Sequence, residues 1–124
     1  YDQLFVDIPQ IKLPSRPEKA KQVYHLYIVR AKRRDELLSF LISKGIDAKI
    51  HYPVPMHLQP AAKEYRYQEG DFPVTEATCK SVISLPVHEY ITTEQLEFVA
   101  QQIRNFYKWD KNFLIYIYLV IYIR

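Results

Sequence analysis

Apolar positions along the chain follow two different periods, and the changes of period predict an order of strands and helices. Residues 23–29 are rich in β-branched and aromatic side chains and predict a strand. From residue 35 to residue 44 the large apolar residues recur at helical spacing, and Gly45 follows as a C-terminal signal. Residues 46–50 then alternate apolar and polar side chains, which is typical of a half-exposed strand. This order predicts two strands of one sheet with a helix on a single face.

The region from residue 58 to residue 87 predicts shorter elements. Residues 58–67 predict a short helix that Pro60 either starts or interrupts. A second helix is expected from residue 72 to about residue 82, with a proline tolerated in its first turn and three buried side chains, Val74, Ala77 and Val82. Residues 84–87 predict an edge strand, because Pro86 cannot donate a hydrogen bond to a sheet ladder.

The clearest helix of the sequence begins near Thr92. Thr92 and Gln95 have the spacing of a capping box, in which each side chain bonds to the other residue's backbone N–H. One apolar stripe follows at helical spacing, formed by Leu96, Val99, Ala100, Ile103 and Phe106. Together the elements predict a single α+β domain, with a small, mostly antiparallel sheet and helices packed on one face.

The two ends of the chain differ from this pattern. Residues 1–22 contain three prolines and several charges and predict an irregular, extended connector. Residues 113–123 are an unbroken apolar run, too short to span a bilayer, which needs about 20 such residues. Their isoleucine, tyrosine and valine content favours a strand over a helix. The run is an added strand, a partner-binding segment or sequence foreign to the domain, and the abrupt change of composition favours the last.

Composition and charge narrow the classes of function. A chain of 124 residues supports one domain with a modest core. The net charge is only +3, and no Lys/Arg stripe is interleaved with aromatic residues, so we expect no nucleic-acid partner. The single cysteine, Cys79, excludes an internal disulfide and a cysteine-based zinc cluster. The four histidines are too scattered for a metal motif, so no metal is expected.

The loop that follows the second predicted strand is the candidate site. Pro53 and Pro55 fix their own φ angles and push the residues before them into extended geometry. The loop should therefore be stiff, and it carries His51, Tyr52 and His57. Stiff loops with polar aromatic side chains are places where binding groups occur. On spacing alone, however, the favoured interpretation is a turn whose histidine and tyrosine cover the core.

Five sequence blocks in a fixed order change that interpretation. The blocks are HLYIVRAKRRDELLSFLISKGI (25–46), IHYPVPMHLQPA (50–61), EGDFPVTE (69–76), SLPVHEYITTEQ (84–95) and VAQQIRNFY (99–107). In this order they resemble the C-terminal domain of the DegT/DnrJ/EryC1/StrS family, which comprises fold-type-I, pyridoxal-phosphate-dependent aminotransferases acting on nucleotide-linked keto sugars. The resemblance covers residues 24–107.

The resemblance implies how the chain is organised. Residues 1–22 would connect to an N-terminal domain outside this chain, residues 23–107 would be the aminotransferase C-terminal domain, and residues 108–124 would be an atypical apolar tail. A chain that begins with Tyr1 and holds one methionine is expected to be a fragment. In the family the pyridoxal phosphate lies mainly in the larger N-terminal domain, which also supplies its Schiff-base lysine. This chain would then contribute substrate binding and would not be catalytic alone.

The resemblance also implies a reaction and a setting. An amino group would move from an amino acid, typically glutamate, to a nucleotide-linked keto sugar, in an enzyme of polysaccharide biosynthesis. The parent enzyme would be a cytoplasmic homodimer without a membrane span. Two alternatives stay open: a sugar dehydratase of the same family, and a non-catalytic module that binds sugar nucleotides. Membrane association through the tail ranks lowest, because the run is short and lacks a basic amphipathic face.

For the loop, the resemblance places the counterparts of His51 and Tyr52 at the mouth of the active site, near the nucleotide-sugar. This reverses the preference for these two residues, which become the predicted substrate-binding pair. His57 shares the loop and is the third predicted substrate-binding residue, although packing within the loop is the favoured role for it. His25 and His88 are expected to be structural. No catalytic residue is predicted within the chain.

Overall fold

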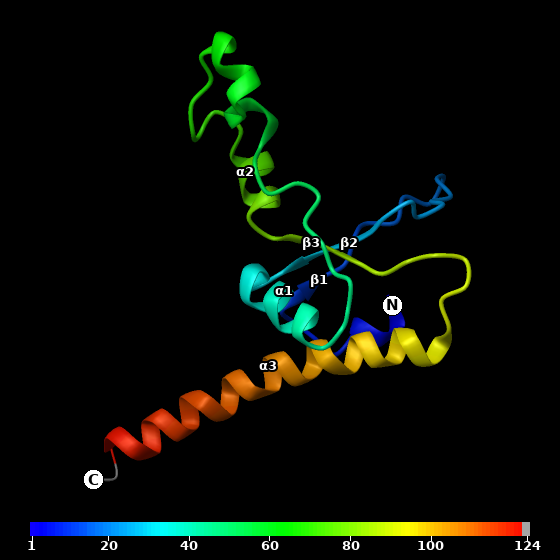
Figure 1. The fold of residues 1–124 in the computed structure, drawn as a ribbon, viewed down its shortest axis with the longest axis vertical. Coiled ribbons are helices and arrows are strands. Elements are labelled where there is room, and N and C mark those ends of the chain that lie inside the picture. The colour runs from blue at the N-terminus through cyan, green and yellow to red at the C-terminus, as the bar shows by residue number, and fades with distance from the viewer. Residues whose placement is uncertain (123–124) are drawn as a thin grey trace.

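The computed structural model describes the backbone of residues 1–122 and the side chains of residues 1–108 (Figure 1). In chain order its elements are η1 (Gln3–Phe5), β1 (Ile11–Lys12), β2 (Tyr27–Ala31), α1 (Arg34–Ser43), η2 (Met56–Leu58), η3 (Pro60–Tyr65), α2 (Pro73–Cys79), β3 (Val82–Leu85) and α3 (Thr93–Tyr122). The three η elements are single stretches of 3₁₀ helix.

The strands form one antiparallel sheet in the order β1-β2-β3. β2 pairs with β1 on one side and with β3 on the other, where Tyr27 is opposite Leu85. β3 lies at the edge of the sheet, as predicted, but it begins two residues earlier than the predicted strand of residues 84–87 and ends directly before Pro86. Side chains of β2 alternate between buried and half-buried positions, so one face of this strand covers the core. The fold is therefore the expected α+β arrangement with an antiparallel sheet.

The second expected strand, residues 46–50, is reduced to one bridge. Only Lys49 pairs with β3, opposite Ser84. Ile46 and Ala48 are buried and the polar residues between and after them are exposed, so the alternation correctly predicted burial. The N–H of Ala48, however, bonds to the carbonyl of Ile46, which turns the chain before a ladder can form. The expectation of a strand was wrong here because local turn bonds replaced the ladder.

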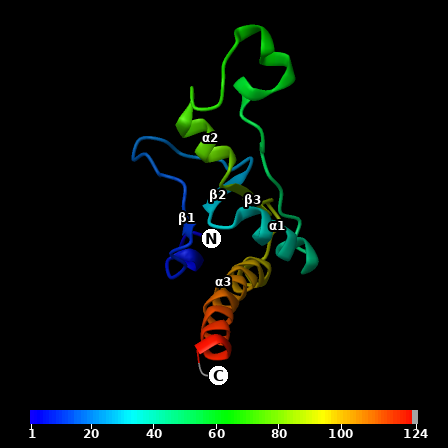
Figure 2. The same cartoon turned by 90° about the vertical axis from the view of Figure 1, so that its left-hand side faces the viewer.

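α1 and α3 enclose the core against the sheet (Figure 2). Leu37 and Leu41 of α1, Ile83 of β3 and Ile103 of α3 are fully buried. α1 matches the expected helix of residues 35–44 to within one residue at each end. Of the predicted α3 stripe, three residues are buried and two are half-buried: Leu96, Val99, Ala100, Ile103 and Phe106. We call the sheet together with η1, α1 and residues 93–108 of α3 the body.

The first residues of the chain contribute more to the body than an irregular connector would. Phe5, Ile8 and Ile11 are buried in the core, whereas residues 13–26 contain no helix or strand. The strand expected from residue 23 starts only at Tyr27. Tyr24 has a φ of 53°, in the left-handed region, which interrupts extended backbone. The assignment of residues 1–22 to a link with another domain stays a prediction.

A second region, residues 50–72, extends away from the sheet in both views (Figures 1 and 2). We call it the lobe; it contains η2 and η3 and leads into α2. α2 ends at Cys79, three residues earlier than predicted, and Val82 belongs to β3. Val74 is 75% exposed and Ala77 is exposed, so these two predictions of burial were wrong, whereas Val82 is buried as predicted, although in β3. The side chain that α2 buries is Glu76.

α3 begins with the predicted capping box and continues far beyond the body. The N–H of Thr92 donates to Oε1 of Gln95 at 3.0 Å, and the N–H of Gln95 donates to Oγ1 of Thr92 at 3.3 Å. The helix runs on to Tyr122, away from the sheet (Figure 1). The strand expected in the tail was therefore wrong through this residue, because adding residues to an existing helix needs no new nucleus. The last two tail residues, Ile123 and Arg124, lie outside the described part.

None of the helices within the described part of the chain combines the length and the apolar character that crossing a bilayer requires.

Candidate functional site

His51 is held at the point where the lobe leaves the sheet. Its Nδ1 lies 2.8 Å from Oγ of Ser84, a buried residue of β3. The backbone of Ser84 is fixed in turn by two hydrogen bonds with Lys49, of 2.7 and 3.1 Å. Nε2 of His51 has no hydrogen-bond partner among the described residues. The imidazole is therefore oriented through one nitrogen and can offer the other to a ligand.

Tyr52 lies beside His51 and points into solvent. It is 70% exposed, and its ring meets the imidazole edge-on at a centroid distance of 5.6 Å. Its hydroxyl forms no hydrogen bond to any residue that the structure describes. Pro55, two residues after Pro53, is buried and anchors the loop. The loop thus presents an imidazole nitrogen and a phenol hydroxyl next to one another.

His57 has a different environment from the other two predicted site residues. Its Nε2 lies 3.1 Å from Oε1 of Glu76, and the two side chains are only 7% and 8% exposed. Its ring packs on Phe72 at 4.7 Å between centroids, with Tyr67 edge-on to it at 6.5 Å. This geometry supports packing within the lobe. A substrate contact by His57 stays a prediction.

Glu76 is the residue of this region that the sequence analysis missed. Its carboxylate accepts hydrogen bonds from the N–H of Gly70 at 2.9 Å and from the N–H of Phe72 at 3.3 Å, besides the contact with His57. The Gly70 N–H is the largest influence that holds the pKa of Glu76 below its ordinary value. An acidic residue soon after Pro73, in the first turn of a helix, was the available signal, because such residues reach back to free backbone N–H groups.

The remaining histidines lie apart from this loop. His25 is exposed and precedes β2, and His88 is exposed and follows β3. Nδ1 of His88 accepts a hydrogen bond from the N–H of Tyr90 at 3.2 Å. Across the residues that the structure describes, no three His, Cys, Asp or Glu side chains are grouped to hold a metal ion. The structure brings together His51 and Tyr52, with His57 further along the same loop and turned to Glu76.

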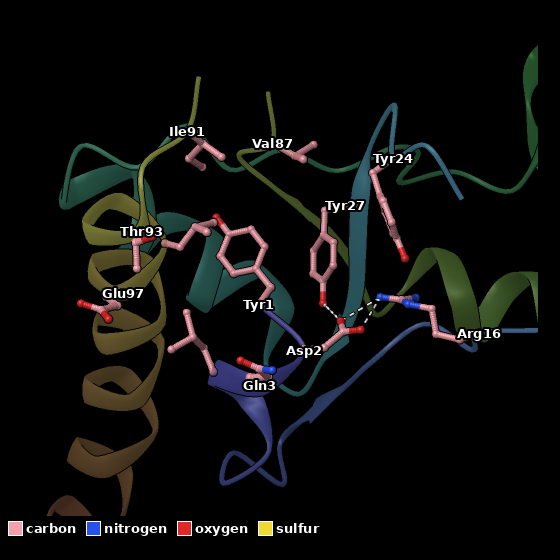
Figure 3. A pocket seen from close by; sticks show the side chains of 12 residues that line it. Tyr1, Asp2, Gln3, Arg16, Tyr24, Tyr27, Val87, Ile91, Thr93 and Glu97 are labelled. Carbon is pink, nitrogen blue, oxygen red and sulfur yellow. Dashed lines mark hydrogen bonds and ion pairs between the residues drawn. The ribbon is translucent and has the colours of Figure 1, made fainter. Parts of the chain in front are cut away.

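A hollow of about 590 Å³ lies elsewhere, beside the N-terminus of the chain (Figure 3). Within it Asp2 lies between Arg16 and Tyr27: it accepts hydrogen bonds from Nη2 of Arg16 at 2.8 and 2.9 Å and from the hydroxyl of Tyr27. The Arg16 guanidinium also lies over the ring of Tyr24, 5.0 Å from its centroid. Burial raises the pKa of Tyr1 to about 12. Asp2 and Arg16, two of the charged residues that line this hollow, bind each other, which favours a structural role for this pair over ligand binding.

Comparison with known proteins agrees with the resemblance seen in the sequence. The model of the DegT/DnrJ/EryC1/StrS aminotransferase family matches residues 1–104. The chain is 40% identical over 98 residues to a dTDP-3-amino-3,4,6-trideoxy-alpha-D-glucose transaminase of Streptomyces venezuelae, which covers 79% of this chain and 26% of the relative. It is 38% identical over 95 residues to a pleiotropic regulatory protein of Geobacillus stearothermophilus, covering 77% of this chain and 26% of that protein.

A solved structure shows the same fold. The crystal structure of S. venezuelae DesV in complex with a ketimine intermediate matches with a TM-score of 0.79 and 38% identity, over 84% of this chain and 28% of DesV. The chain thus spans only about a quarter of the length of the relatives that it matches. The match begins at residue 1, so it includes residues that precede the 24–107 range of the sequence resemblance. The chain belongs to the DegT/DnrJ/EryC1/StrS aminotransferase family.

Proposed function

We propose that this chain is the substrate-binding C-terminal part of an enzyme that transfers an amino group from an amino acid to a nucleotide-linked keto sugar. Glutamate is the proposed donor, and His51 and Tyr52 are the proposed contacts to the sugar nucleotide. The observation that carries the proposal is the pairing of an unbonded Nε2 with an unbonded phenol hydroxyl on one proline-braced loop, within the described residues. The dTDP-sugar named in the S. venezuelae transaminase supports this class of substrate.

The chemistry of the two groups suits such a ligand. A sugar nucleotide presents hydroxyl groups and phosphate oxygens, all of which accept hydrogen bonds. When the Ser84 hydroxyl donates to Nδ1 of His51, the ring proton is on Nε2, which can then donate to a ligand oxygen. The phenol of Tyr52 can donate or accept. Pro53 and Pro55 limit the freedom of the loop before binding, which lowers the entropy lost when the ligand binds.

Pyridoxal phosphate, which the family implies, does not fit the residues described here. The cofactor provides an electron sink for amino-group transfer, and it needs an enclosed lysine that forms a covalent bond with it. Every lysine whose side chain the structure describes is exposed. We therefore assign the cofactor to the rest of the enzyme and give this chain the tasks of binding and orienting the sugar nucleotide. A cytoplasmic homodimer acting in polysaccharide biosynthesis completes the proposal, and the family resemblance supports it.

The test uses the complete enzyme with single changes in the loop. His51→Ala and Tyr52→Phe each remove one hydrogen bond, so we expect the KM for the nucleotide sugar to rise about threefold to tenfold. His25→Ala is the matched control, because His25 is exposed and lies outside the lobe. Steady-state kinetics with the sugar nucleotide varied is the measurement. Unchanged KM and kcat in both loop variants would remove the binding role, and release of a dehydrated sugar without amination would favour the dehydratase alternative.

A further inference from the structure

We propose that Glu76 is the positioning residue that fastens the lobe to the body and so holds the His51–Tyr52 loop in place for its ligand. The functional consequence rests on the function proposed above, whereas the fastening itself does not. The proposal gives a task to a buried carboxylate that contacts no other described acid or base except His57.

The partners of Glu76 come from two separate segments of the lobe. His57 lies in the first half of the lobe, and Gly70 and Phe72 lie at its far end. Their donor groups converge on one carboxylate, with the Gly70 N–H bonding to both oxygens at 2.9 and 3.1 Å. The Glu76 side chain thus joins His57 to residues 70–72, two segments of the lobe that are well separated in sequence. Charge-assisted hydrogen bonds of this kind are stronger than neutral ones.

Little besides Glu76 holds the lobe together. The His57 ring packs on Phe72 and Tyr67, but these two residues are 40% and 49% exposed. Pro55 is the only residue between residues 50 and 72 that is buried as a whole, so the lobe lacks an extended apolar core. Besides Glu76, the side-chain ties from the lobe to later residues are the His51–Ser84 hydrogen bond and a pair between Glu69 and Lys80. The Glu69–Lys80 pair is 3.1 Å long, and both side chains are about 70% exposed to solvent. An ion pair this exposed contributes little.

Glu76 is itself fixed to the body through α2. It belongs to α2, whose last residue, Cys79, accepts a hydrogen bond from Nη1 of Arg34 at 2.9 Å. The same nitrogen donates to the carbonyl of Val82 at 2.9 Å. The Arg34 side chain is buried at the start of α1. Hydrogen bonds therefore connect α1 to α2, and α2 to the lobe through the Glu76 carboxylate.

The experiment measures amide hydrogen exchange in the 124-residue chain, as wild type and as Glu76→Ala, Glu76→Gln and Glu69→Ala. In Glu76→Ala we expect the amides of Gly70 and Phe72 to exchange at least about tenfold faster, because their acceptor is gone. Amides of β3 and of residues 99–103 should not change. Glu76→Gln keeps one carbonyl oxygen and should restore part of the protection, and the exposed Glu69→Ala is the control that should match the wild type.

Two results would overturn the fastening role. The first is that the amides of Gly70 and Phe72 are not protected from exchange in the wild type. The second is that both amides remain fully protected in Glu76→Gln and in Glu76→Ala. If the amides of the whole chain exchange rapidly in Glu76→Ala, that variant is unfolded, and Glu76→Gln, which preserves side-chain volume, decides whether the fastening role holds.

A second experiment, on the kinetics of the complete enzyme, tests whether fastening of the lobe affects ligand binding. In the complete enzyme, Glu76→Gln should raise the KM for the nucleotide sugar at least threefold and change kcat less than twofold, because a displaced loop weakens binding before it affects the reacting groups. An unchanged KM together with a loosened lobe would refute the link from Glu76 to the ligand. If His51→Ala and Tyr52→Phe also leave KM unchanged, the proposed function fails, while the exchange result still stands for Glu76.

Discussion

The body and the lobe are held together by different forces. In the body, Leu37, Leu41 and Ile83 are fully buried, and the cohesion comes from apolar surface removed from water. In the lobe, many large apolar side chains remain exposed, and the buried Glu76 carboxylate of the adjoining α2 accepts hydrogen bonds from its far end and contacts His57 in its first half. Apolar burial is spread over many contacts, whereas the lobe depends on a few directional bonds and a few half-exposed ring contacts. The comparison indicates that the body fixes the fold, and the exposed apolar side chains of the lobe support the proposal that this region meets a ligand.

The largest expected effect comes from a cavity in the body. Leu41→Ala removes a fully buried side chain between α1 and the sheet, and such changes cost about 2–5 kcal/mol of unfolding free energy. Met56→Ala, at a lobe residue that is 81% exposed, should change the unfolding free energy by less than about 0.5 kcal/mol. Urea unfolding of both variants is the measurement. An equal loss of unfolding free energy in the two variants would mean that the lobe is as well packed as the body, which would contradict the difference between them.

A smaller effect is expected at the start of α3. Thr92→Ala removes the hydroxyl that accepts from the N–H of Gln95, and the loss of such a cap costs about 1 kcal/mol. Thr93→Ala, one residue further along, leaves the cap intact and serves as the control. Thermal unfolding should show a lower Tm for Thr92→Ala only. Faster exchange of the lobe amides in Thr92→Ala would show that the two regions are less independent than the contacts indicate.

The sequence predicted the body better than the lobe, for physical reasons. α1 and the capping box of α3 depend on local periodicity and on side chains three residues apart, which a sequence displays directly. The bond from Glu76 to His57 joins residues 19 apart through a fold that periodicity does not describe. The start of β2 was misplaced because the left-handed φ of Tyr24 has no signal in residue type.

The candidate site could be predicted in part. The prolines pointed to the loop, whose stiffness stays a prediction, and the block order identified the family that the comparisons confirm. The separation of His51 and Tyr52 from His57 was not visible, because it depends on which side chain finds a buried partner. In the tail, residue composition favoured a strand, while the backbone continues the helix that the body had already started.

The most direct test of the account follows the protection of lobe and body amides as the pH is lowered. The pKa of Glu76 is held below its ordinary value of 4.5, chiefly by the N–H of Gly70. A carboxylate with a lowered folded-state pKa stabilises its region fully above the unfolded-state pKa, and this stabilisation is lost as the pH falls through the lowered value. Among the described residues, His57 is the titratable side chain that faces the Glu76 carboxylate.

We predict that the protection factors of the Gly70 and Phe72 amides, corrected for intrinsic exchange, decrease when the pH is lowered below 4.5. Those of the Ile83 and Ile103 amides should not decrease. In Glu76→Gln the two lobe amides should already be less protected at neutral pH, and they should lose this acid-dependent step. Loss of protection in lobe and body at the same pH, or an unchanged acid step in Glu76→Gln, would contradict the account.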